Sequence, residues 1–202
     1  MTCVVLLSGG MDSAVALHWA IAHRRPAFAL AIDYGQAHRV RELAAAREIA
    51  KAAWLPLREG RLLAPWPPMQ GDVVPGRNLH LLNAAAAQGA VRGGGEPVDV
   101  VIGCNLADAD GFPDCRPEFL AAAGHAIGLG LGVPVQIVAP FIASTKAQIV
   151  RDARELGPAA WHALRLSWSC YRGGDAPCGE CGACIKRSDG FAEACEEDPW
   201  RA

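Results

Sequence analysis

The chain has 202 residues, of which 51% are hydrophobic and 20% charged, and its 19 basic and 21 acidic residues give a formal net charge of −2. This composition excludes a disordered chain, and the near-neutral charge provides no basic field for holding a nucleic-acid backbone. No apolar stretch approaches the roughly 20 residues that span a bilayer, and the Met1–Leu7 segment lacks the basic start of a signal peptide. We therefore expect a soluble, cytoplasmic protein with no membrane partner and no direct nucleic-acid partner.

Apolar runs alternate with amphipathic stretches along the chain. In chain order the pattern predicts a strand at Thr2–Leu7, a helix at Asp12–His23, a strand at Ala27–Asp33, a helix at His38–Ala52, a strand at Trp54–Arg58, a loop at Ala64–Arg77, a helix at Asn78–Val91, a strand at Val98–Gly103, a helix at Arg116–Gly130, a strand at Val133–Ala139 and a helix at Ser144–Leu156. Strands that are apolar nearly throughout and are separated by helices are typical of a parallel sheet covered on both faces. We therefore predict a doubly wound α/β domain with a mainly parallel sheet at residues 1–160, followed by a small cysteine-rich module at residues 161–202.

A glycine turn follows the first predicted strand, in the string Ser8-Gly9-Gly10-Met11-Asp12-Ser13. Glycines permit positive φ angles and a close backbone approach, and the free N–H groups at the start of the next helix form a site for anions. No Walker-type lysine follows, so the turn suits a pyrophosphate unit. The string resembles the pyrophosphate loop (PP-loop) of the PP-loop ATP pyrophosphatase superfamily, whose members activate a carbonyl oxygen with ATP. The resemblance assigns nucleotide binding to Ser8, Gly9, Gly10, Asp12 and Ser13.

Four of the eight cysteines crowd into fifteen positions, with the spacing Cys170-x7-Cys178-x2-Cys181-x2-Cys184. Two-residue spacers and neighbouring glycines let these sulfurs point at one centre, and four thiolates suit tetrahedral Zn²⁺ with no open coordination position. We predict one structural zinc ion per chain, held by the four cysteines. An iron–sulfur cluster would use the same ligands, and four unlinked thiols are the remaining alternative.

Four further segments follow the pattern of one family within the superfamily. They are Asp33-Tyr34-Gly35-Gln36 with His38, Val74-Pro75-Gly76-Arg77-Asn78, Gly111-Phe112-Pro113-Asp114-Cys115-Arg116-Pro117-Glu118-Phe119 and Ser144-Thr145-Lys146. With Ser169-Cys170-Tyr171 and the cysteine spacing, they resemble the 7-cyano-7-deazaguanine synthase family over nearly the whole chain. That family converts 7-carboxy-7-deazaguanine, ammonia and ATP into a nitrile of queuosine biosynthesis, through adenylation of the carboxylate and an amide. The resemblance implies ATP with Mg²⁺ as substrate, small-molecule partners and a homodimer.

Such a reaction needs cations for the phosphate oxygens and polar groups for the deazaguanine acid. Lys146 and Arg77 are the candidates for stabilising the phosphate charge. A carboxylate can accept both the N1–H and the exocyclic amine of the ring, and Asp114 or Glu118 is the candidate. The guanidinium of Arg116 suits the substrate carboxylate. Ordinary structural roles compete with each assignment: surface charges for the lysine and arginines, and a helix cap for Asp114.

Asp33 ends the second predicted strand and Gln36 follows it, at the edge of the sheet where ligands of open α/β sheets bind, and we assign both to the nucleotide site. The chain departs from the family pattern at three places. The family usually has an aromatic residue and a serine where this chain has Ala109 and Asp110, and a basic residue at Ala37. These departures leave open whether the product is the nitrile or an amide, and which amine is the acceptor.

Two other functions use the same motifs. A PP-loop enzyme that thiolates tRNA would need a basic RNA-binding surface, against which the net charge of −2 argues. A non-catalytic zinc module for protein interaction would tolerate a degenerate loop, but the loop residues are intact.

Overall fold

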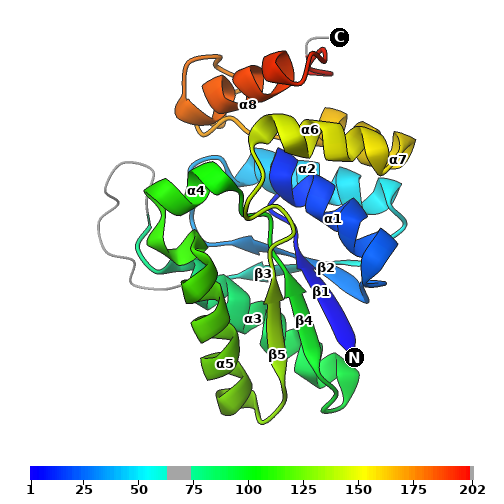
Figure 1. Ribbon diagram of the computed structural model, residues 1–202, viewed down its shortest axis with the longest axis vertical. Coiled ribbons are helices and arrows are strands. Elements are labelled where there is room, and N and C mark those ends of the chain that lie inside the picture. The colour runs from blue at the N-terminus through cyan, green and yellow to red at the C-terminus, as the bar shows by residue number, and fades with distance from the viewer. Residues whose placement is uncertain (63–73, 201–202) are drawn as a thin grey trace.

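The computed structural model describes residues 1–62 and 74–200, and within them five parallel strands form one sheet (Figure 1). In their order across the sheet, the strands are β3 (Leu57–Arg61), β2 (Phe28–Asp33), β1 (Thr2–Leu6), β4 (Val98–Val101) and β5 (Val135–Val138). The chain begins in the centre at β1, moves outward to β3, and returns to the other side of β1 with β4. This is the doubly wound topology, so the predicted fold class is confirmed.

Helices cover both faces of the sheet (Figure 1). The first face carries α1 (Met11–His23), α2 (Arg39–Ala52), α6 (Lys146–Glu155) and α7 (Pro158–Leu166), and α8 (Gly182–Glu193) packs on α6. The second face carries α3 (Arg77–Gly93) and α5 (Pro117–Leu131). The short α4 (Leu106–Gly111) and a 3₁₀ turn at Pro113–Cys115 precede α5 in the chain. Successive residues of β1 alternate between the two cores: Val5 joins the first and Val4 and Leu6 the second. Among the described residues, no helix combines the length and apolarity that crossing a membrane requires.

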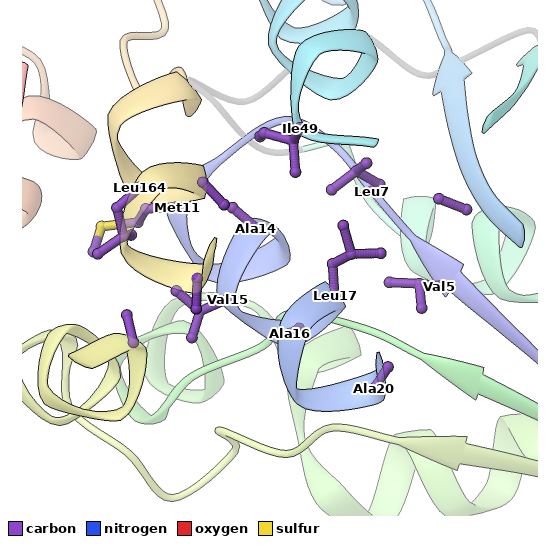
Figure 2. Packing of buried hydrophobic residues seen from close by; sticks show 14 of the residues in the cluster. Val5, Leu7, Met11, Ala14, Val15, Ala16, Leu17, Ala20, Ile49 and Leu164 are labelled. Atoms are coloured by element: carbon purple, nitrogen blue, oxygen red, sulfur yellow. The ribbon is translucent and has the colours of Figure 1, made fainter. Parts of the chain in front are cut away.

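The central helix α1 is buried on nearly every side, because its sequence is apolar all round. Leu17 points toward Val5 and Leu7 of the sheet side, while Met11 lies against Leu164 of α7 (Figure 2). All of these residues belong to one apolar cluster. The glycine turn that precedes α1 is therefore attached to a helix that is packed into the core from its first residue, Met11.

The five predicted strands and five predicted helices are present, and β3 is displaced along the chain. The prediction began this strand at Trp54, but β3 begins at Leu57. Trp54 instead lies in the turn that closes α2, with φ of 53° and a side chain that is 94% exposed, and its N–H donates to Lys51 O. Residues 64–73 of the predicted loop lie outside the described residues, and Arg77 already belongs to α3.

Three helices were not predicted: α4, α7 and α8. The prediction ended a helix at Gly157-Pro158, whereas Pro158 is the first residue of α7, a position that proline favours because it needs no N–H partner there. In α4, Asn105 and Asp108 form a reciprocal capping box within an acidic segment. The domain boundary at residue 160 stays a prediction; α7 lies across it and shares a core with α1.

Candidate active site

A cavity of about 290 Å³ opens at the carboxyl ends of the central strands. Leu6 and Leu7 border it at the end of β1, Ile32 at the end of β2, and Ile102 and Gly103 after β4. The chain reverses its direction of winding between β1 and β4, and ligands of doubly wound sheets bind at that point. Of the twelve candidates for catalysis and nucleotide binding, seven line the cavity: Ser8, Gly10, Asp12, Ser13, Gln36, Arg77 and Lys146. Gly9, Asp33, Asp114, Arg116 and Glu118 are not among the described residues that line it.

The glycine turn leads directly from β1 into α1. Ser13 Oγ donates to Gly10 O at 2.9 Å and lies 3.0 Å from Ser8 Oγ, and Trp168 N–H donates to Gly9 O at 2.8 Å. Gly10 is the N-cap of α1, and no side chain caps the helix. The first N–H groups of a helix have no partner within it. They therefore remain available for anionic oxygens at the cavity, with the positive end of the helix dipole behind them.

Gly9→Ala is expected to destabilise the protein much more than Gly10→Ala. Gly9 has φ of +88°, and a Cβ there would lie 2.3 Å from Glu42 O of α2. The backbone strain alone costs about 1–3 kcal/mol, and the clash adds to it. A Cβ at Gly10 would meet nothing closer than Ser8 Oγ at 3.4 Å, and φ is −73°. Urea unfolding of both variants measures the difference, and equal losses would contradict this account of the turn.

A polar cluster lies beside the turn. Lys146 Nζ, at the start of α6, forms an ion pair with Asp12 Oδ2. The buried Asn105 donates from one amide nitrogen to Asp12 Oδ2 at 3.2 Å and to Asp108 Oδ2 at 2.7 Å. Burial, and then the charge of Asp12, raise the pKa of the Asp108 carboxyl. The cluster thus holds two carboxylates close together next to the anion-binding turn.

Asp12 Oδ1 is buried and has no hydrogen-bond partner in the described part of the chain. An ionised carboxylate oxygen that is shielded from water and left unpaired is costly. Together with the neighbouring Asp108, this oxygen is a donor set that suits a hard divalent cation.

Another polar group lies around the start of α3. Arg77 donates from Nη1 to Tyr34 Oη at 3.1 Å and from Nη2 to Asn78 Oδ1 at 3.1 Å, and its guanidinium lies 5.4 Å from the centre of the Tyr34 ring. Burial raises the pKa of the Tyr34 hydroxyl, which keeps it protonated. Gln36 supports this arrangement, because its Oε1 accepts the Tyr34 N–H at 3.0 Å. The cavity therefore has a cationic, aromatic wall formed by Arg77 and Tyr34.

The remaining candidates are placed differently. Asp114 Oδ2 accepts the N–H of Asn78 at 3.0 Å, so this carboxylate holds the first turn of α3. Arg116 is exposed and donates to Ala109 O at 3.1 Å. Asp33 Oδ1 accepts the Gly35 N–H at 2.8 Å within the turn after β2. None of the three borders the cavity as the described residues define it; their assigned roles stay predictions.

The four predicted metal ligands come together. The Sγ atoms of Cys170, Cys178, Cys181 and Cys184 all lie within 4.8 Å of one another, and those of Cys178 and Cys184 are 4.0 Å apart. Backbone N–H groups of Glu180 and then Cys181 lower the pKa of Cys178 to about 6. A tetrahedron with bonds of about 2.3 Å has edges of about 3.8 Å, so this group can hold a metal ion.

The cysteine segment is connected through α8 to the side of the cavity that Lys146 borders. Arg187, which is 1% exposed, donates to both carboxylate oxygens of Asp198 at 2.9 Å and to Ser167 Oγ at 2.7 Å. A Cβ at Gly190 would lie 2.6 Å from the Cβ of Lys146, so only glycine lets α8 approach α6 this closely. The segment that follows the cysteine cluster thereby packs on Lys146, which lines the cavity.

Sequence reasoning missed three charged residues that line the cavity: Glu42, Asp108 and Lys186. Asp108 could have been recognised by its capping-box spacing after Asn105. Nothing in the local sequence marks Lys186, which looks like a surface residue of a helix.

Comparison with known proteins agrees with this geometry. The family model described as Queuosine biosynthesis protein QueC matches residues 2–60 and 67–195. The chain is 38% identical to the 7-cyano-7-deazaguanine synthase of Laribacter hongkongensis, over 97% of this chain and 92% of that protein. It is 38% identical to the enzyme of that name from Chromobacterium violaceum (97% and 91% covered) and 35% identical to that of Thermoplasma acidophilum (97% and 90%). The predicted resemblance is confirmed: the chain belongs to the QueC family of queuosine biosynthesis proteins.

Proposed function

We propose that the protein is an ATP-dependent carbon–nitrogen ligase that converts 7-carboxy-7-deazaguanine and ammonia into 7-cyano-7-deazaguanine. The observation that carries the proposal is one cavity bordered both by an anion-binding turn with the Asp12–Lys146 pair and by the Arg77–Tyr34 wall. The first group suits the phosphates of ATP, and the second suits an aromatic acid. The names and sequence identity of the relatives support the same reaction.

The chemistry requires two activations. A substrate carboxylate oxygen attacks the α-phosphorus of ATP, and the bond to pyrophosphate breaks. Ammonia then attacks the acyl carbon, and AMP leaves to give the amide. The amide oxygen is adenylated by a second ATP, and loss of AMP and protons gives the nitrile. Negative charge moves onto phosphate oxygens in each activation, where fixed donors and cations lower the barrier most.

The residues of the cavity have distinct roles in this proposal. The turn of Ser8, Gly9 and Gly10 and the first N–H groups of α1 hold the phosphates, with Ser13 Oγ beside them. Lys146 stabilises the charge of the leaving pyrophosphate. Arg77 binds the substrate carboxylate from the side of Tyr34, since Arg116 lies outside the cavity.

Two of the remaining candidates act indirectly. Asp114 keeps the start of α3 in place for Arg77, through its bond to Asn78. Asp33 shapes the turn that presents Tyr34 and Gln36.

ATP is used with Mg²⁺ in this proposal, and the unpartnered Asp12 Oδ1 with the adjacent Asp108 fits that ion. A bound Mg²⁺ would neutralise phosphate charge and orient the polyphosphate. The four cysteines fit Zn²⁺, which would have no open position and would fix the fold of the cysteine segment.

Mass spectrometry of the products from 7-carboxy-7-deazaguanine, ammonia and ATP tests the function. We expect the nitrile together with AMP and pyrophosphate. If only the amide accumulates, the protein is an amide-forming ligase and the proposal is wrong. The experiment addresses this outcome because Ala37, one of the positions at which the chain departs from the family pattern, borders the cavity. No reaction, with turnover appearing only when tRNA is added, would support the thiolation alternative.

A further inference from the structure

Lysine is rare in this chain. Of its 19 basic residues only Lys51, Lys146 and Lys186 are lysines, and the other 16 are arginines. Two of the three lysines, Lys146 and Lys186, line the cavity. Lys186 is contributed by α8, two residues after Cys184.

The geometry of α8 turns one of its faces to the cavity. Ala183 and Lys186 both line it, and residues three apart lie on the same side of a helix. Cys184 and Arg187, each one position further, are buried between α8 and the rest of the molecule. Since Cys181 is the N-cap of α8, the cysteine cluster and the buried Arg187 together fix where Lys186 enters the cavity.

Lys186 differs from the other basic residues of the cavity in its partners. Lys146 is paired with Asp12, Arg77 is held by Tyr34 and Asn78, and His38 lies 3.3 Å from Glu42. Lys186 makes no hydrogen bond or ion pair within residues 1–62 and 74–200, and its side chain is exposed. Its charge is thus available to a ligand, with no hydrogen bond or ion pair to another described residue that must first break.

The negative charge beside the glycine turn favours an additional cation there. Asp12 and Asp108 bring two negative charges next to the phosphate site, and Lys146 offsets one of them. Lys186 is close enough to act electrostatically on Asp108. Without Lys186 this group would carry a net charge of −1 and would repel a nucleotide polyphosphate; with it the group is neutral before any metal binds.

We propose that Lys186 of the metal-binding segment binds the polyphosphate of the nucleotide, so that the segment contributes directly to the ATP site. The proposal rests on ATP binding as described under the proposed function. In this proposal the cysteine cluster positions the ammonium group of Lys186 for ligand binding, and it also stabilises the fold of the cysteine segment.

Calorimetric titration of the zinc-loaded protein with ATP and with AMP, both in the presence of Mg²⁺, tests this assignment. Lys186→Met is expected to raise the Kd for ATP about tenfold, the effect of losing one charged hydrogen bond. Lys186→Arg keeps the charge and is expected to restore most of the affinity. Lys51→Met, at the exposed end of α2, is the matched control and should bind ATP as the wild type does. None of the variants should change the Kd for AMP, which lacks the β- and γ-phosphates.

The outcomes separate this inference from the proposed function. If the wild type does not bind ATP, the ligase proposal fails and the inference with it. If the wild type binds ATP but Lys186→Met binds equally well, the inference alone is wrong. Equal weakening of ATP and AMP, or a Lys186→Arg variant as weak as Lys186→Met, would also overturn it.

Lysine acetylation of the wild-type protein gives an independent measurement, because the modification of only three lysines has to be followed. Saturating ATP should slow acetylation of Lys186 and leave that of Lys51 unchanged, and AMP should protect neither. An unchanged rate at Lys186 in the presence of ATP would contradict the proposal, whatever the variants show.

Discussion

Asp12→Asn is expected to lower kcat for ATP-dependent turnover by at least about 100-fold, the loss seen when a single fixed charge-stabilising group is removed from an active site. The substitution keeps the shape of the side chain but removes its charge. Lys146 then loses its ion-pair partner, and the buried Oδ1 that fits Mg²⁺ becomes part of a neutral amide. The fold should persist, because α1 is held by apolar packing along its whole length.

Asp110→Asn is the matched control for this variant. Asp110 lies on α4, close in sequence to Asp108, but it is exposed and does not border the cavity. Release of pyrophosphate, measured together with thermal unfolding, distinguishes a catalytic loss from misfolding. Full activity of Asp12→Asn would remove the main support for the phosphate site, and an equal loss in Asp110→Asn would point to a general effect of negative charge.

Cys181→Ser is expected to release the metal and to lower the melting temperature sharply. Structural zinc of this type contributes about 10–16 kcal/mol, comparable to the whole free energy of unfolding of a domain, about 5–15 kcal/mol. Cys181 is both a member of the cluster and the N-cap of α8. Loss of the metal should therefore release α8 from α6, where Gly190 packs on Lys146. We expect ATP turnover to fall along with stability.

Cys195→Ser provides the control, because Cys195 is an exposed free cysteine outside the cluster. Elemental analysis of the metal content and thermal unfolding of the same samples test whether Cys181 is a metal ligand that stabilises the fold. An unchanged zinc content in Cys181→Ser would exclude the residue as a ligand. Iron in place of zinc would leave the ligand set intact and change the identity of the metal.

The fold could be predicted from the sequence because four of its five described strands are mainly apolar; β3, with the sequence Leu57-Arg58-Glu59-Gly60-Arg61, is not, and the prediction began it three residues too early. The glycine turn could be predicted because its glycines and serines are adjacent in the chain. The cysteine cluster was predictable for the same reason, since its ligands lie within fifteen positions. Lys186 could not be found in this way, and the only local signal of Asp108 is its capping-box spacing after Asn105. They meet only when α4 and α8, from distant parts of the chain, face the same cavity.

Asp114 illustrates a second limit of sequence reasoning, because a motif can mark a residue without showing what its side chain contacts. Its place in a dense motif predicts a ligand-binding carboxylate, and that role stays a prediction; in the structure its Oδ2 accepts the N–H of Asn78, 36 residues earlier in the chain. The sequence identifies the segment as important, and only the tertiary arrangement separates a residue that faces the substrate from one that supports such a residue.

One apolar cluster contains Met11 at the start of α1, Leu164 of α7 and Phe191 of α8. The sheet-forming part of the chain and its cysteine-rich end consequently share one hydrophobic core. A shortened chain that kept every strand and the whole glycine turn, but ended before α7, would expose that interior to water and would tend to aggregate instead of behaving as a small autonomous ATP-binding protein.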